Sequence, residues 1–158
     1  MTMQSAAVRR RRAVAAAGAV SAGLLVLSAC DKPTPMSTVT VGSDSVTSEA
    51  LCYNDGDTLK AADIAKCQKD EDVKSIKVGQ DETVRIGVDQ EIADQEWTVL
   101  MNGRAISDPS ESTYRTVPGS VFFNAQYGAQ GDSTVISVKA GGDKDVTGLW
   151  SFKLEKDY

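Results

Sequence analysis

The chain of 158 residues contains no histidine. Without an imidazole it can form neither a Ser-His-Asp nor a Cys-His nucleophile system, and no histidine-ligated zinc, copper or iron centre. Aromatic residues make up only 6% of the chain, and only three cysteines are present. These scarcities exclude the commonest catalytic and metal-binding arrangements, so the reactive groups that remain abundant are carboxylates.

The charges are distributed unevenly along the chain. Arg9 to Arg12 supply four of the 17 basic residues, and none of the 22 acidic residues precedes Cys30. The part from Cys30 onward therefore has 13 basic and 22 acidic residues, a net charge of −9. This charge favours solubility, and it argues against binding to nucleic acid and against charge-driven adhesion to anionic lipid.

Residues 1–29 have the layout of a signal peptide. The arginine run is followed by an apolar stretch from Ala13 to Val26, too short to span a bilayer core of ~30 Å. Leu27-Ser28-Ala29-Cys30 then reads as a lipobox, which predicts cleavage before Cys30 and lipidation of its thiol. We expect a lipoprotein on the outer face of the bacterial cytoplasmic membrane. The alternatives are an ordinary secretory signal with an incidental Cys30, or an uncleaved anchor.

A diacylglycerol on Cys30 would bury two acyl chains, which suffice for stable anchoring. Residues 30–37 are polar and contain Pro33 and Pro35, so we interpret them as a tether that reaches only ~20 Å at ~3.1 Å per residue. The arginine run also suits twin-arginine export, although it lacks the bulky residues of a strong signal. Both export routes therefore stay open.

Use of Cys30 for the lipid leaves Cys52 and Cys67. In an oxidising compartment these two are expected to form a disulfide, which would close a loop of about 16 residues worth ~3 kcal/mol. Their spacing does not fit a redox Cys-x-x-Cys motif, and two cysteines make a poor zinc site. We therefore predict a structural disulfide.

Alternation of apolar and polar residues, typical of β-strands, dominates the rest of the chain. Asn102-Gly103 predicts a hairpin turn, and residues 140–145 predict another turn between antiparallel neighbours. A short helix is expected from Leu59 to Gln68, capped by Asp57 or Thr58. Strands are expected around residues 39–41, 76–78, 84–88, 97–101, 114–117, 121–123, 136–138 and 150–154.

This pattern predicts a mainly β fold over residues 38–158. We expect an immunoglobulin-like antiparallel β-sandwich of about 7–9 strands with one short helix, after a cleaved signal peptide. The Cys52–Cys67 bridge would fix the helix to its neighbouring strand. A further turn of helix could occupy residues 90–94, before the strand of Trp97.

The sequence resembles a group of actinomycete, especially streptomycete, secreted lipoproteins that carry a domain of unknown function. The resemblance implies a location on the outer face of the cytoplasmic membrane, and it supplies no catalytic residues. It extends over nearly the whole chain and rests on these segments: the leader RRAVAAAGAVSAGLLVLSACDKPTP, Thr38-Val39-Thr40-Val41, Cys52 with Cys67, Val84-Arg85-Ile86-Gly87-Val88-Asp89, Ile92-Ala93, Trp97, and Gly148-Leu149-Trp150-Ser151-Phe152.

Carboxylates offer the main candidate chemistry. Asp89, Glu91, Asp94 and Glu96 cluster before Trp97, an arrangement that could serve glycoside hydrolysis or calcium binding, although a solvated loop is the commoner meaning. Residues 54–57, Asn-Asp-Gly-Asp, are rich in oxygen ligands but lack the rest of an EF-hand, so we interpret them as a turn.

Three other features have structural interpretations. Trp97 and Trp150 lie on apolar strand faces and are expected in the core. Residues 131–134, Gly-Asp-Ser-Thr, resemble an esterase nucleophile block, but no histidine is present to activate the serine, and we interpret them as a turn entering a strand. Residues 120–127 could line a polar groove with Asn124, Gln126 and Tyr127.

Taken together, the residues predict a membrane-anchored extracytoplasmic lipoprotein with no enzymatic activity, most simply an interaction or accessory module that contacts an envelope protein. The alternative is a lipoprotein that binds a small molecule or ion. No catalytic, cofactor-binding or metal-binding residue is assigned, and no nucleic acid partner is expected. The assigned residues are Cys30 for lipidation, and Cys52 and Cys67 for the disulfide.

Overall fold

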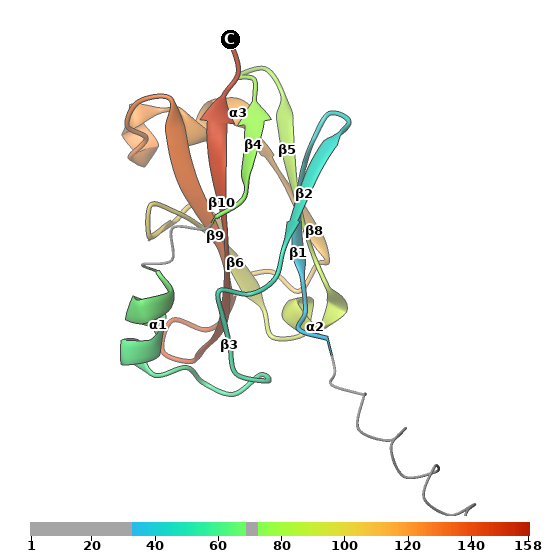
Figure 1. The fold of residues 1–158 in the computed structure, drawn as a ribbon, viewed down its shortest axis with the longest axis vertical. Coiled ribbons are helices and arrows are strands. Elements are labelled where there is room, and N and C mark those ends of the chain that lie inside the picture. The colour runs from blue at the N-terminus through green and yellow to red at the C-terminus, as the bar shows by residue number, and fades with distance from the viewer. Residues whose placement is uncertain (1–32, 69–72) are drawn as a thin grey trace, which may run out of the picture. The chain divides into compact units, whose positions relative to one another are not determined.

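Two β-sheets packed face to face make up the domain in the computed structural model, which describes residues 33–68 and 73–158 (Figure 1). The first sheet has the order β2 (Asp44–Ser48), β1 (Ser37–Val41), β5 (Thr83–Val88) and β8 (Tyr114–Pro118). The second has the order β3 (Cys52–Tyr53), β10 (Val146–Lys156), β9 (Ser133–Gly141), β6 (Trp97–Met101) and β7 (Arg104–Ala105), and β4 (Ser75–Val78) also pairs with β10.

The connections between the sheets are those of an immunoglobulin-like sandwich. The chain crosses from the first sheet to the second between β5 and β6, and again between β8 and β9. Within the sheets, β5 pairs with β8, β6 with β9 and β9 with β10, all antiparallel. Strand β4 lies parallel to β10, the one parallel pairing among the described strands. The predicted fold class is confirmed.

The core lies between the two sheets and follows from the alternation of each strand. Apolar side chains at every second position point inward, and two short helices close the ends of this layer. The buried residues of the core are Val39, Val41, Ile76, Val78, Val84, Ile86, Val88, Ile92, Ala93, Trp97, Val99, Met101, Phe122, Ile136, Val138, Ala140, Trp150, Phe152 and Leu154.

Helix α1 (Ala61–Cys67) occupies the place of the expected helix but begins later. Its N-cap is Lys60, without a side-chain hydrogen bond, so the predicted cap at Asp57 or Thr58 is wrong. Those two residues precede the helix in an exposed turn. Helix α2 (Gln90–Ala93) forms where a further turn of helix was considered, and it buries Ile92 and Ala93.

The expected strand at residues 121–123 is wrong, because this segment forms helix α3 (Gly119–Phe122). The helical turn directs Phe122 into the core and leaves Val121 and Phe123 half-buried, so three successive apolar residues did not mean a strand covered on both faces. Gly119 permits the turn, since a Cβ there would lie 2.3 Å from the carbonyl oxygen of Gly79.

Short strands account for the difference in strand number, which is ten among the described residues against the expected seven to nine. Strands β3 and β7 contain only two residues each, and β2 is polar and half-exposed, so none of the three carries a strong alternation. The hairpin at Asn102-Gly103 is confirmed, with left-handed backbone angles at both residues (φ 49° and 81°).

Candidate functional site

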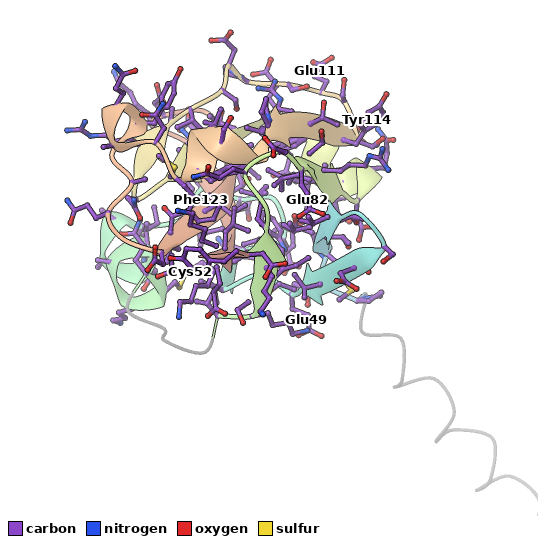
Figure 2. The ribbon with its side chains drawn as sticks, turned by 90° about the horizontal axis from the view of Figure 1, so that it is seen from above. Glu49, Cys52, Glu82, Glu111, Tyr114 and Phe123 are labelled. Carbon is purple, nitrogen blue, oxygen red and sulfur yellow. A yellow bond between two sulfur atoms is a disulfide. The ribbon has the colours of Figure 1, made fainter. Side chains whose placement is uncertain are left out.

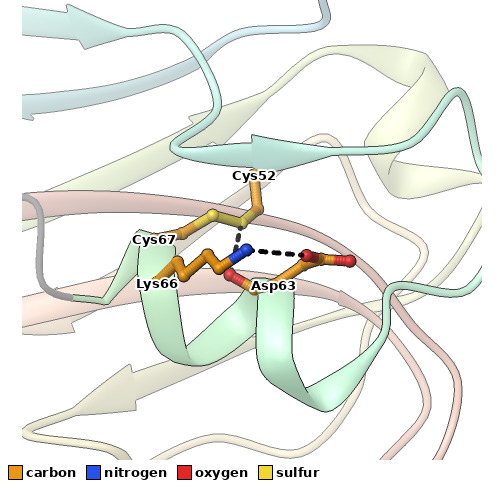
Figure 3. Close-up of polar contacts among 4 residues, drawn as sticks. All are labelled: Cys52, Asp63, Lys66 and Cys67. Atoms are coloured by element: carbon orange, nitrogen blue, oxygen red, sulfur yellow. Dashed lines mark hydrogen bonds and ion pairs between the residues drawn. A yellow bond between two sulfur atoms is a disulfide. The ribbon is translucent and has the colours of Figure 1, made fainter.

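The disulfide joins Cys52 at the start of β3 to Cys67 at the end of α1, with 5.8 Å between their Cα atoms (Figure 3). The Cys52 sulfur also lies 3.4 Å from the carbonyl oxygen of Asp63, one turn before Cys67. Lys66 and Asp63 form an exposed ion pair at 3.9 Å beside it. The bridge fixes the helix to its neighbouring strand, as predicted from the number of cysteines and an oxidising compartment.

A pocket of about 470 Å³ lies between β3 and α1, inside the loop that the disulfide closes. Its polar groups come from Asn54, Thr58, Lys60 and Asp63, and its apolar wall includes Leu59. The pocket is open to solvent, and helix α1 on one side of it has no buried residue. It is one place in the described structure where the small ligand of the alternative interpretation could bind.

Three hydrogen bonds fix the segment just before β1, one to the opposite sheet and two to the residue that follows the neighbouring strand β5. The Trp150 indole Nε1 donates to the carbonyl oxygen of Pro35 at 2.8 Å, in a buried position. The Met36 amide donates to Asp89 Oδ2 at 2.8 Å, and the Asp89 amide donates back to the Met36 carbonyl at 3.1 Å. Pro35 and Met36, which the sequence analysis assigned to the tether, are thus held against the domain.

Tyr53 covers the outer side of this attachment. Its ring lies 5.9 Å from that of Trp150, and its hydroxyl donates to Glu91 Oε1 at 2.6 Å. Burial of the hydroxyl, together with the hydrogen bond and negative charge of Glu91, raises the pKa of Tyr53 to about 12. The tyrosine therefore stays protonated and serves as a hydrogen-bond donor.

The four clustered carboxylates do not converge on one site. Asp89 holds Met36, Glu91 accepts from Tyr53, and Asp94 accepts from the Gln90 amide at 2.7 Å. Glu96 lies in the turn before β6 with a left-handed φ of 57°. Each of these side chains or backbones thus has a local structural role around α2, which explains why acidic residues follow β5 so closely.

Residues 54–57 form the turn that was predicted for them. The amide of Asp57 donates to the carbonyl of Asn54 at 2.7 Å, and Asp55 and Gly56 have positive φ angles. Within the described residues, no group of three or more histidine, cysteine, aspartate or glutamate side chains is placed to hold a metal ion.

Both tryptophans are fully buried, as expected of core residues. The Trp97 Nε1 donates to the carbonyl oxygen of Ser112 at 2.7 Å, and the guanidinium of Arg115 lies 5.8 Å from the ring. The turn at Gly131 leads directly into β9 at Ser133, also as expected. Asn124, one of the proposed groove residues, uses its side chain to accept the amide of Gln126 at the start of η1 (Ala125–Tyr127).

Cys30 and the whole predicted leader lie outside the described residues. In the described ranges, no helix is long and apolar enough to cross a membrane.

The sequence patterns missed the attachment of Pro35 and Met36. The residues that hold this attachment, Trp150 and Asp89, lie far from it in the chain. Only the pairing of β1 with β5 brings Asp89 beside Met36.

These features define a small immunoglobulin-like sandwich that is reinforced by a disulfide. The segment just before β1, Pro35 and Met36, is docked against its core. The chain belongs to the family described as a protein of unknown function (DUF2771), which matches residues 31–145. No curated protein and no solved structure matches the chain.

Proposed function

We propose that this protein is a lipid-anchored, extracytoplasmic interaction module without enzymatic activity, held at the outer face of the bacterial cytoplasmic membrane through Cys30. The support lies in the lipobox at residues 27–30 and in the docked segment that follows it. Pro35 and Met36 are hydrogen-bonded to Trp150 and Asp89, so the chain between the proposed lipid and the domain is short.

The docking of Pro35 and Met36 is the main support for the proposal, because it limits the distance between the domain and a lipid on Cys30. Pro35 follows Cys30 by five positions, a span of ~15 Å at ~3.1 Å per residue. The domain would therefore stay next to the bilayer, where it could contact the outer part of a membrane protein. β1 starts beside α2, and the C-terminus lies at the other end of the sandwich (Figure 1).

The chemistry of the chain supports a binding role. The sequence contains no histidine, three of the four candidate carboxylates (Asp89, Glu91 and Asp94) have local structural partners, and both tryptophans are buried in the core. We expect the partner to be an envelope protein. The pocket of about 470 Å³ between β3 and α1 favours the second candidate, a lipoprotein that binds a small polar molecule.

Labelling with a radioactive fatty acid tests the anchor. We expect the full chain to incorporate palmitate and to be shortened, whereas Cys30→Ala should do neither. A Cys52→Ala, Cys67→Ala double variant serves as the matched control and should be labelled and processed like the original. Unchanged labelling of Cys30→Ala would contradict the anchor.

Crosslinking in intact cells, followed by purification from solubilised membranes, tests the partner. A protein recovered reproducibly in near-stoichiometric amount with the original, and lost with Cys30→Ala, would support the interaction module. Recovery of the lipoprotein alone, together with thermal stabilisation by a sugar, peptide or ion, would favour the second candidate instead.

A further inference from the structure

The outer face of the first sheet is lined by hydroxyl groups. Strand pairing aligns Thr47, Thr38, Gly87 and Tyr114 in one row across β2, β1, β5 and β8. On β1 and β5 the neighbours at alternate positions are buried in the core, and the register places Thr47 and Tyr114 on the same side of the sheet, so these four positions face outward. Thr38 and Thr47 contact each other through their hydroxyls at 2.9 Å.

A second row lies next to the first and contains the one charged side chain of the two rows. It consists of Ser45, Thr40, Arg85 and Thr116 on the same four strands. In the described part of the chain, the guanidinium of Arg85 forms no ion pair and no hydrogen bond. The hydroxyl groups of this row also have no hydrogen-bond partner there. The row therefore offers free donors and acceptors to a ligand.

A hollow of about 260 Å³ opens beside Arg85. It is lined by Thr40 and Thr83 from the sheet and by Gly42 and Glu82 from the turns at its edge. One oxygen of Glu82 accepts the Gly79 amide at 2.8 Å, which holds the carboxylate at the rim of the hollow. A donor with five N–H groups and a fixed acceptor thus flank a space lined by hydroxyls.

Tyr114 stands at the far edge of the same face, on β8, with 62% of its side chain exposed. Figure 2 shows it on the periphery of the domain, well away from the core. Its cross-strand neighbour is Gly87, which has no side chain to cover the ring. Only backbone oxygens lie within 4 Å of the position that a Cβ on Gly87 would take, so there is free space beside the ring.

Threonine favours β-strands, so a solvent-facing sheet can be rich in it without any ligand. The outer face of the second sheet provides a comparison for the charged side chains. There the cations are paired with carboxylates: Lys153 with Glu155 at 3.0 Å, and Lys77 with Asp157 at 3.7 Å. The first sheet differs in carrying an unpaired arginine, a hollow and an exposed aromatic ring among uncharged hydroxyls.

We propose that this face, the hydroxyl face, binds an uncharged glycan chain. Hydroxyl rows spaced by neighbouring strands, ~4.8 Å apart, can exchange hydrogen bonds with successive sugars. Arg85 and Glu82 would bind sugar hydroxyls at the hollow, and the ring of Tyr114 would pack against the apolar side of a pyranose. This inference does not rest on the lipid anchor.

Other partners fit the hydroxyl face poorly. Protein interfaces concentrate aromatic and apolar side chains at their centre, and lipid binding needs a broad apolar surface. Nucleic acid and acidic polysaccharides need several cations, whereas the two rows have one and the chain from Cys30 onward carries a net charge of −9. An uncharged polyhydroxylated chain matches the uncharged hydroxyls.

The test is a titration of the full-length protein, purified in detergent, with neutral hexasaccharides of glucose, mannose or N-acetylglucosamine. A hexasaccharide that contains glucuronate is the charged comparison. We expect calorimetry to detect binding of at least one neutral hexasaccharide, with an affinity that changes little with salt. Arg85→Gln and Tyr114→Ala should each weaken it about tenfold, or ~1.4 kcal/mol.

Arg104→Gln and Tyr158→Ala are matched controls, because both residues are exposed and lie outside the hydroxyl face. They should bind like the original, and thermal unfolding should show that all four variants fold. The proposal is overturned if no neutral hexasaccharide binds, if the controls weaken binding equally, or if the glucuronate chain binds better in a salt-dependent way.

Discussion

At the scale of single residues, Trp150 is packed tightly against a glycine of its own strand. Gly148 precedes it by two positions on β10, so both residues face inward on the same strand. A Cβ on Gly148 would lie 2.4 Å from the Trp150 ring and 3.1 Å from that of Tyr53. The absence of a side chain at Gly148 is what allows the indole to reach Pro35.

We therefore expect Gly148→Ala to lower the free energy of unfolding by about 1–3 kcal/mol, the usual cost of overpacking. Gly142→Ala is the matched control, because nothing lies within 4 Å of its added Cβ. Urea denaturation followed by tryptophan fluorescence measures both. Equal stability of the two variants would contradict the packing around Trp150.

A second prediction concerns Tyr53, whose pKa of about 12 exceeds the ordinary value of 10.0 because of burial and Glu91. A folded-state pKa above the unfolded one contributes stability that is fully present below pH 10 and is lost as the pH rises toward 12. The free energy of unfolding should therefore fall more steeply in this window for the original than for Tyr53→Phe. Parallel pH profiles would contradict the assigned environment.

At the scale of elements, the disulfide stabilises a part of the fold that has little core of its own. Helix α1 buries no residue completely, and Cys52 and Leu149 lie outside the main core cluster. Replacing both cysteines by alanine should lower the free energy of unfolding by about 3 kcal/mol.

The near-ultraviolet circular dichroism of Trp97 and Trp150 should keep its shape in this double variant, because both rings pack between the sheets. Loss of that signal under native conditions would show that the bridge supports the whole sandwich. An unchanged urea midpoint would show that the bridge stabilises neither the segment around α1 nor the sandwich as a whole.

Elements with a regular alternation could be predicted from the sequence, and elements set by distant contacts could not. Val84, Ile86 and Val88 alternate with polar residues and form β5 as expected, and Asn102-Gly103 specifies its hairpin locally. Residues 121–123 have no period, and the contact between Gly119 and the β4–β5 turn decides their conformation. Strand β3 exists only because β10 and the disulfide hold it.

The features of the candidate site also divide into those that the sequence could predict and those that it could not. The pairing of Cys52 with Cys67 followed from counting cysteines, and it is confirmed. The docking of Pro35 and the hydroxyl face depend on strand register, since Thr40 meets Arg85 only when β1 pairs with β5. Register between strands 45 residues apart is a tertiary property that no local pattern carries.

At the scale of the whole molecule, both sheets contribute to one core. Side chains of β5 and β9 belong to the same buried cluster, so neither sheet can keep its apolar face covered without the other. We predict a single cooperative unfolding transition in urea, with coincident curves from tryptophan fluorescence and far-ultraviolet circular dichroism. Two separate transitions would contradict a shared core.

The pairing of β10 has a consequence for the order of folding. This strand lies beside β3, β4 and β9, so most of the second sheet is assembled around it. Its partner β3 precedes it by nearly a hundred residues, and such distant contacts form slowly. A chain whose synthesis has not yet reached Val146 can pair β6 with β7 and β9, but its strands β3 and β4 have no partner in this sheet. The second sheet would therefore stay incomplete during a process that requires an unfolded polypeptide.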